Sequence, residues 1–189
     1  MSILPIVTIP DKGLRQKTRP VTAFNQELQI LIDNMIETMQ AANGAGLAAP
    51  QIGQPYQLAV IETPPEVDEA GEEIEGTRQT YVIINPEIVW TSRETIKGVE
   101  GCLSIPGYVG EVERADSIRV RAQDRHGRKI RLKVDDWTAR IFQHEIDHLN
   151  GVLYIDKLTG PENIWTEEEF EEILEARRNG KDIAPVVGD

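Results

Sequence analysis

The first clear pattern of apolar and polar positions runs from about Phe24 to Ala42. Apolar side chains recur there every three or four residues, at Leu28, Leu31, Ile32, Met35, Ile36 and Met39. This spacing places them on one face of an α-helix. Thr22 is a suitable N-cap, and Asn43-Gly44 tolerates the left-handed turn at which helices end. We therefore predict an amphipathic helix near the N-terminus.

The middle of the chain has the patterns of β-strands. Short apolar runs at 58–61 and 81–84 indicate buried strands, and the acidic segment 64–76 between them has no apolar period. We expect that segment to be an exposed, mobile loop. Residues 118–122 and 129–134 alternate apolar with charged side chains around a turn sequence, which predicts a β-hairpin with one solvated face.

Two further helices are predicted after the hairpin. Residues 137–149 have helical apolar spacing and are followed by Asn150-Gly151, a typical C-cap. Residues 166–178 begin with Thr166 and a cluster of Glu and end with two Arg, which suits both ends of the helix dipole. The order of elements favours an α+β fold in which antiparallel strands pack around a central helix at 137–149, with an N-terminal and a C-terminal helix. At this length, one domain spanning 1–189 is expected.

Charge and composition narrow the function. The net charge of −12 argues against a protein that binds phosphate backbones over its whole surface, although a local basic patch could exist. DNA is therefore not expected as a partner. No apolar run approaches the roughly 18 residues of a membrane span, and the N-terminus lacks the pattern of a signal peptide. Cys102 is the only cysteine, which excludes an internal disulfide and suits a reducing compartment such as the cytoplasm.

The helix at 137–149 carries the pattern H-E-x-x-H. His144 and His148 stand four residues apart, so both imidazoles leave the same face and can bind one metal ion. Glu145 between them can take a proton from water in the ion's open position. The alternative is a chance match in which both histidines only pack within the fold.

A catalytic ion needs a third protein ligand, and no histidine follows His148. Glu167 and its neighbours are candidates, but Cys102 in the segment GVEGCLSIPGYVG offers a thiolate. A lone cysteine is otherwise most often a small buried apolar residue. The loop GAGLAAPQ at 44–51 lacks the lysine of a phosphate-binding loop, and the amide of Gln51 could donate a hydrogen bond to a developing oxyanion.

Together, the segments GAGLAAPQ, EGCLS and QHEIDHLNG resemble the peptide deformylase family, in the bacterial form with a C-terminal helix. The resemblance extends over nearly the whole chain. It implies hydrolysis of the formyl group of N-formylmethionyl nascent polypeptides to formate. The implied roles are metal ligation by Cys102, His144 and His148, proton transfer by Glu145, and oxyanion stabilisation by Gln51 and the backbone N–H of Leu103.

The same resemblance implies a substrate pocket. It is expected to include Ala45, Gly46, Tyr108, Trp137, Arg140 and Ile141. Ala45 departs from the family, which more often has Ile or Val there, so a slightly larger pocket is expected. A tight site beside Gly46 could exclude acyl groups larger than formyl. Glu100 with Arg114 could support the loop before Cys102, with Asp147 nearby, or all three could be ordinary surface charges.

The resemblance also implies Fe²⁺ as the ion, for which Zn²⁺, Ni²⁺ or Co²⁺ can substitute, because a Cys/His/His set does not by itself separate these metals. It further implies a monomer that associates transiently with the ribosome and binds no membrane. Two other functions stay open from the residues. One is a zinc metallopeptidase of the H-E-x-x-H type, and the other is a non-catalytic metal-binding protein with the same fold.

Overall fold

The computed structural model describes residues 2–65, 68, 70, 72 and 74–179. Its α-helices are α1 (Gln26–Ala41), α2 (Asp136–Leu149) and α3 (Glu167–Arg178), and its short 3₁₀ helices are η1 (Lys12–Arg15), η2 (Ala49–Ile52) and η3 (Tyr154–Lys157). Its strands are β1 (Gly46–Ala48), β2 (Leu58–Glu62), β3 (Thr80–Thr91), β4 (Thr95–Cys102), β5 (Ile105–Ala115), β6 (Ser117–Gln123), β7 (Lys129–Asp135) and β8 (Ile164–Thr166).

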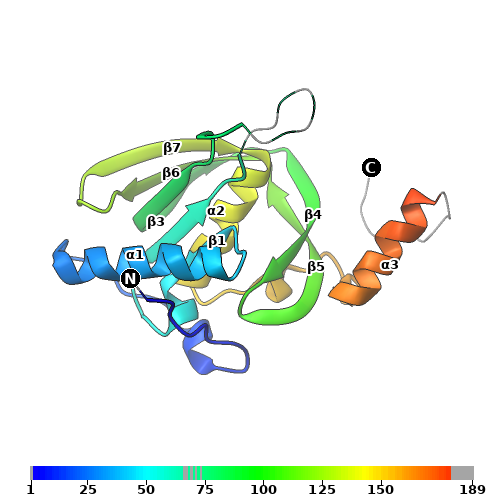
Figure 1. Cartoon of the computed structure of the whole chain (residues 1–189), viewed down its shortest axis with the longest axis horizontal. Coiled ribbons are helices and arrows are strands. Elements are labelled where there is room, and N and C mark those ends of the chain that lie inside the picture. The colour runs from blue at the N-terminus through cyan, green and yellow to red at the C-terminus, as the bar shows by residue number, and fades with distance from the viewer. Residues whose placement is uncertain (1, 66–67, 69, 71, 73, 180–189) are drawn as a thin grey trace.

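The strands form two antiparallel sheets, ordered β1-β2-β3-β6-β7 and β4-β5-β8. Helix α2 lies in the middle of the molecule, between the larger sheet and the β4–β5 hairpin, and α3 lies at one end (Figure 1). The α+β architecture with a central helix that carries H-E-x-x-H is therefore confirmed. This arrangement brings the end of β4 close to α2, although the two are far apart in the sequence.

The larger sheet buries both of its faces where β1 and β2 lie. Strand β2 is buried along its whole length, which explains its continuous apolar sequence. Because side chains alternate across a strand, Ala59 and Ile61 join the core shared with α2, whereas Leu58 and Val60 join the core shared with α1. We call these the α2 face and the α1 face of the sheet.

The N-terminal helix and the hairpin were predicted correctly as elements. The hairpin is β6–β7, with Ile118 opposite Val134. The predicted cap of α1 is wrong: the N-cap is Asn25, whose side chain accepts a hydrogen bond from the Leu28 N–H at 3.1 Å. Thr22 lies three residues too early, because the chain stays extended until Asn25. Asn43 does adopt the left-handed conformation after the helix, with φ of 53°.

Four strands were not predicted from the pattern. Strands β4 and β5 mix glycine, charged and apolar residues without strict alternation, and β1 and β8 have three residues each.

The helix cap at Thr166 is confirmed, since its side chain accepts from the Glu169 N–H. The expected acidic loop at 64–76 lies partly outside the described residues. No helix in the described part of the chain is long and apolar enough to cross a membrane.

Gly151, which follows α2, allows a sharp test of this packing. Its φ is +73°, and an added Cβ would lie 2.5 Å from the backbone oxygen of Arg15. We expect Gly151→Ala to lower the free energy of unfolding by about 2–4 kcal/mol in urea titrations, since a left-handed backbone costs about 1–2 kcal/mol and overpacking adds a similar amount.

Gly107→Ala is the matched control. Gly107 has φ of +80°, but nothing lies within 4 Å of its added Cβ. It should therefore lose only the backbone contribution, and equal losses in the two variants would show that the contact with Arg15 is unimportant.

Candidate functional site

Helix α2 presents the three residues of its motif towards the centre of the molecule. His144, Glu145 and His148 are all at least nine-tenths buried. The two imidazole rings are adjacent, with centroids 4.9 Å apart, as expected for residues one helical turn apart. Burial of this many polar groups requires partners, because an unpaired buried polar group is costly.

Cys102 comes to this motif from the end of β4. The ladder between β4 and β5 shifts register between Gly101 and Cys102, and the chain turns there. The Sγ atom lies 3.3 Å from Nε2 of His148. Among the described residues, Cys102, His144 and His148 form a group whose donor atoms all lie within 4.8 Å of one another. The alternative ligand Glu167 is not part of this group.

Glu100 fixes the orientation of His144. Its Oε2 lies 2.9 Å from Nδ1 of His144, which directs Nε2 of that ring towards Cys102 and the candidate metal site. Burial raises the pKa of Glu100, but hydrogen bonds from Arg114 and His144 outweigh it and hold the pKa far below its ordinary value. The carboxylate is therefore charged, and it favours the tautomer of His144 with the proton on Nδ1.

Two buried arginines hold Glu100 in turn. Arg114 donates to both carboxylate oxygens at 2.9 Å and to Asp147 at 2.5 Å. Arg140 donates to Glu100 at 2.8 Å and to the backbone oxygens of Ile96, Gly98 and Val112. Both arginines and Glu100 are buried, so the alternative that Glu100 and Arg114 are ordinary surface charges is wrong.

Glu145 is a buried carboxylate, and its Oε2 has no hydrogen-bond partner among the described residues. Burial raises its pKa to about 7, with His144 acting in the opposite direction. Gly46 lies against it: a Cβ on that glycine would be 2.3 Å from Oε1 of Glu145. A proton acceptor with a pKa near neutrality is suited to general acid–base catalysis.

Gln51 approaches the cysteine from the other side, from η2. Its Oε1 accepts from the Ala48 N–H at 2.8 Å, which directs its amide nitrogen towards Sγ of Cys102 at 3.5 Å and Oγ of Ser104 at 3.2 Å. The side chain is almost fully buried. A hydrogen-bond donor is thus held beside the sulfur, which is the arrangement required to stabilise a negative charge there.

A cavity of about 520 Å³ opens over these groups. Of the residues predicted from the sequence, it is lined by Ala45, Gly46, Gln51, Cys102, Leu103, Trp137, Arg140, Ile141, His144 and Glu145. Tyr108 is not among the lining residues, and its side chain is 48% exposed. Arg140 lies at the cavity wall, but its guanidinium is occupied by Glu100 and three carbonyl groups rather than free for a ligand.

Several lining residues were not predicted as site residues. They are Ala42, Asn43, Gly44, Gly101, Pro106 and Gly107. Glu100, predicted only as a support for the loop before Cys102, and Glu167, weighed only as an alternative ligand, line the cavity too. Asn43 and Gly44 end the predicted helix, Gly44 also begins the loop GAGLAAPQ, and Pro106 and Gly107 lie at the start of β5. Their proximity to recognised motifs was the only available signal, because a long-range approach of loops has no local pattern in the sequence.

The donor set fits a divalent metal ion. A thiol and two imidazoles converge, and one imidazole is oriented by a carboxylate. Beside them lies a carboxylate oxygen that has no partner in the part of the chain that the structure describes. Burial lowers the pKa of His144, but its hydrogen bonds to Cys102 and Glu100 raise it to about 10. Burial and the charge of His144 lower the pKa of His148. Metal binding would therefore displace a proton held within this group.

Comparisons with known proteins agree with the geometry. The family described as polypeptide deformylase matches residues 3–163. A peptide deformylase of Symbiobacterium thermophilum is 47% identical over 93% of this chain and 76% of its own length. The crystal structure of peptide deformylase from Ehrlichia chaffeensis is 36% identical, with a TM-score of 0.75 over 97% of this chain and 99% of that chain.

A further structure, of a Met-Ala-Ser-bound peptide deformylase from Acinetobacter baumannii, is 33% identical, with a TM-score of 0.73 over 82% of this chain and 98% of that chain. These matches extend over all three motifs and the strands between them. The chain belongs to the polypeptide deformylase family.

Proposed function

We propose that Cys102, His144 and His148 hold the catalytic metal ion of this deformylase and that Glu145 transfers the protons of its reaction. The enzyme removes the formyl group from the N-terminal formylmethionine of nascent polypeptides and releases formate. One observation carries the assignment of residues: a buried carboxylate, one oxygen of which has no partner among the described residues, lies beside three converging metal-binding donors at the wall of the cavity.

A bound divalent ion would supply Lewis acidity, which lowers the pKa of water and polarises the formyl oxygen. Glu145 accepts the proton of the attacking water, since its pKa of about 7 lets it both take and give protons near neutrality. Water adds to the formyl carbon, and Glu145 then passes the proton to the leaving nitrogen. The C–N bond breaks to give formate and the free amine.

Gln51 and Leu103 stabilise the negative charge that develops on the formyl oxygen. The amide nitrogen of Gln51 is already directed at Sγ of Cys102, and Leu103 follows the cysteine in the cavity wall. Each such donor is worth on the order of 3 kcal/mol of transition-state stabilisation. The carboxylate of Glu145 lies close against Gly46. A tight site beside these two residues would favour formyl over larger acyl groups by size.

The methionine side chain is assigned to the apolar part of the cavity. Ile141 and Trp137 supply this part from α2, and Ala45 from the loop before β1. The Met-Ala-Ser tripeptide bound by the Acinetobacter baumannii enzyme supports a peptide that begins with methionine as the ligand.

The thiolate ligand also bears on the ion. We infer Fe²⁺ as the physiological ion, as the likeness to the family implies. Zn²⁺, Ni²⁺ or Co²⁺ can replace it, because a sulfur and two nitrogens suit all four ions. Metal analysis of protein purified anaerobically from its native cells tests this assignment. A zinc-only protein would contradict it.

We further infer a single-domain monomer at 1–189, located in the cytoplasm, that meets its substrates during a transient association with the ribosome.

An assay with a formylmethionyl peptide separates this function from its alternatives. Anaerobically prepared protein should release one formate for each peptide and leave the internal peptide bonds intact. A zinc metallopeptidase would cut those bonds instead. A non-catalytic metal-binding protein would release nothing while retaining its metal, and that result would exclude the enzymatic function.

We predict that Cys102→Ser loses both bound metal and formate release, because a hydroxyl is a far weaker ligand for these ions than a thiolate. Glu145→Gln, which keeps the size of the side chain and removes its basicity, should retain the metal and lose at least a hundredfold in kcat. Metal content and formate release measured on the same samples check both. Retention of metal and activity by Cys102→Ser would show that another residue is the third ligand.

Gly46→Ala should lower kcat at least tenfold, because the added Cβ would lie 2.3 Å from Oε1 of Glu145 and push that carboxylate from its position. Gly101→Ala is the matched control from the same cavity, since the nearest atom to its added Cβ lies at 3.5 Å. The control should change kcat less. Formate release at saturating peptide measures both, and similar losses would argue against the contact with Glu145.

Arg140→Lys should weaken metal binding about 10- to 100-fold, the usual effect of disturbing groups that orient a ligand. Lysine keeps the charge but cannot reach Glu100 and three backbone oxygens at once. Chelator competition measures the affinity. Glu113→Gln, an exposed change on β5, is the control and should leave affinity unchanged. A normal affinity in Arg140→Lys would mean that Arg114 alone holds Glu100.

A further inference from the structure

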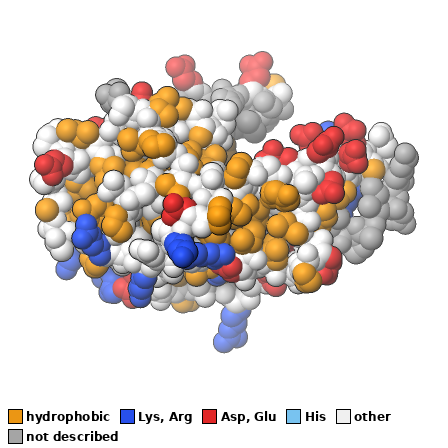
Figure 2. All heavy atoms as spheres, turned by 90° about the horizontal axis from the view of Figure 1, so that it is seen from below, with side chains coloured by type: hydrophobic (Ala, Val, Ile, Leu, Met, Phe, Trp, Pro, Cys, Tyr) orange, Lys and Arg blue, Asp and Glu red, His pale blue; other side chains and the backbone are white. Residues whose placement is uncertain are grey.

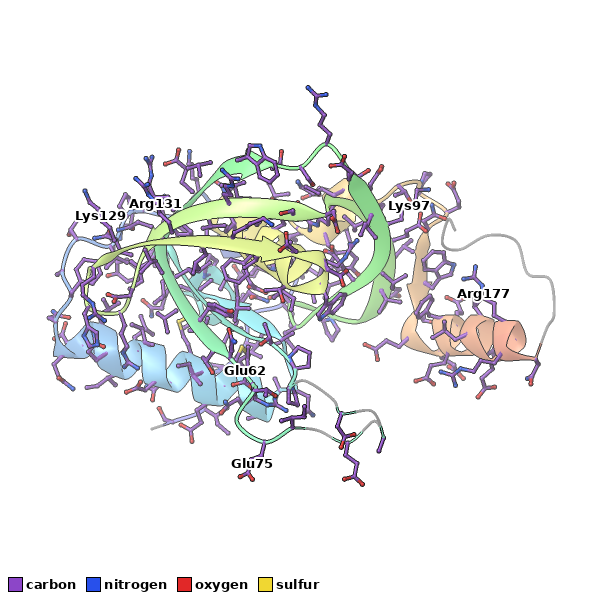
Figure 3. All side chains as sticks on the ribbon, turned by 90° about the horizontal axis from the view of Figure 1, so that it is seen from above. Glu62, Glu75, Lys97, Lys129, Arg131 and Arg177 are labelled. Atoms are coloured by element: carbon purple, nitrogen blue, oxygen red, sulfur yellow. The ribbon has the colours of Figure 1, made fainter. Side chains whose placement is uncertain are left out.

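The charges of this acidic chain are distributed unevenly. Residues 119–133 contain seven Lys or Arg and one Asp, although the whole chain has a net charge of −12. Acidic side chains gather instead over α3 at one end of the molecule (Figure 2). Lys129 and Arg131 lie together beside the β6–β7 hairpin, at the end away from α3 (Figure 3).

The hairpin places these cations on one side of the sheet. Val120, Ala122 and Val134 point into the core shared with α2, so the alternate residues lie on the α1 face. Helix α1 covers that face over β1 and β2, but over β6 and β7 the face is solvent-exposed. We call the exposed part the basic face; it consists of Arg119, Arg121, Lys129, Arg131 and Lys133.

The register of the hairpin sets like charges directly opposite each other. Arg119 pairs with Lys133, and Arg121 pairs with Arg131. Directly opposed like charges destabilise a sheet, so this arrangement is unfavourable for the isolated protein. An anion bound across the pairs would remove that repulsion.

Few counter-charges are available within the described residues. Arg121 pairs with Glu87 at 2.6 Å and Lys133 with Asp135 at 3.3 Å. Arg119, Lys129 and Arg131 form no ion pair with any described residue. Three guanidinium or ammonium groups on one exposed strand pair are therefore available to an external anion.

An aromatic ring adjoins these cations. Trp90 on β3 pairs with Arg119, is 43% exposed, and has the Arg119 guanidinium over its ring at 5.0 Å from the centroid. Two hollows of about 420 and 500 Å³ lie on the same face; Arg121 and Arg131 line both. Cations that follow a backbone and an aromatic platform beside them are the features by which proteins bind single-stranded nucleic acid.

We propose that the basic face is a docking surface for a single-stranded segment of RNA, whose phosphates contact Arg119, Arg131 and Lys129 and one of whose bases stacks on Trp90. The choice of RNA over DNA rests on the proposed function, because nascent polypeptides are made on an RNA-based machine. An anionic membrane would use the charges and would take Trp90 into its interface without a stacked base, so vesicles are a comparison in the test below. An acidic protein segment would likewise make no use of stacking.

The test uses the full, metal-loaded chain and a fluorescein-labelled oligouridine RNA of roughly 12 nucleotides, a length within the usual site size. Fluorescence anisotropy gives Kd at several salt concentrations. We expect binding that weakens with salt. Arg119→Gln/Arg131→Gln should weaken it at least tenfold at low salt and lower the slope of log Kd against log salt by about 1.4, at roughly 0.7 for each lost phosphate contact.

Two further variants separate the contributions. Lys17→Gln/Arg93→Gln also removes two positive charges, but from exposed positions outside the basic face, and it should change Kd little. Trp90→Leu should weaken binding about 5- to 100-fold with an unchanged salt slope, because stacking is not ionic. All variants should release formate from a short peptide at the normal rate. The melting temperature of Arg119→Gln/Arg131→Gln should be no lower than that of the unchanged protein.

Several results would overturn the proposal. They are the absence of salt-sensitive RNA binding, an equal loss in Lys17→Gln/Arg93→Gln, or tighter binding to oligothymidine DNA, to phosphatidylglycerol vesicles or to a poly-glutamate peptide than to the RNA. Normal formate release by a protein that binds no RNA would sink the docking surface and leave the proposed function intact. RNA binding by a protein that releases no formate would contradict the proposed function alone.

Discussion

The buried carboxylate of Glu100 is the interaction on which the site depends. It accepts hydrogen bonds from Arg114 and Arg140 and lies 2.9 Å from Nδ1 of His144, so one side chain joins β4, β5 and α2. Glu100 pairs with both arginines, and Arg114 also pairs with Asp147, so each of these buried charges has an opposite charge beside it, which is the condition for burying such groups at all. Because Cys102 lies two residues after Glu100 on the same strand, the network that orients His144 also positions the sulfur.

Close packing around this network explains the glycines of the site. A Cβ on Gly98 would lie 2.9 Å from the guanidinium carbon of Arg140, and one on Gly46 would overlap Glu145. The absence of side chains at these positions lets the charged groups approach the backbone of β4 and β1. The same packing places the carboxylate of Glu145 directly against the backbone of β1.

Charge is organised along the length of the molecule rather than spread evenly. Acidic residues gather on α3 and basic residues on the β6–β7 hairpin, whereas the cavity is lined mostly by apolar, glycine and paired polar groups. A net charge therefore describes this protein poorly. The like-charge pairs of the hairpin become visible only when its register is known, since the sequence alone shows alternation but not which residues lie opposite each other.

The sequence by itself determined the chemistry. The spacing of His144, Glu145 and His148 on a predicted helix predicts a metal site, because helical geometry puts both imidazoles on one face. The strong apolar periods likewise predicted α1, α2 and the hairpin. Only the tertiary structure brought Cys102 and Gln51 to that helix, buried Glu100 between two arginines and left Tyr108 outside the cavity lining. These contacts join residues distant in sequence, and no local pattern of residues encodes which distant segment will pack against them.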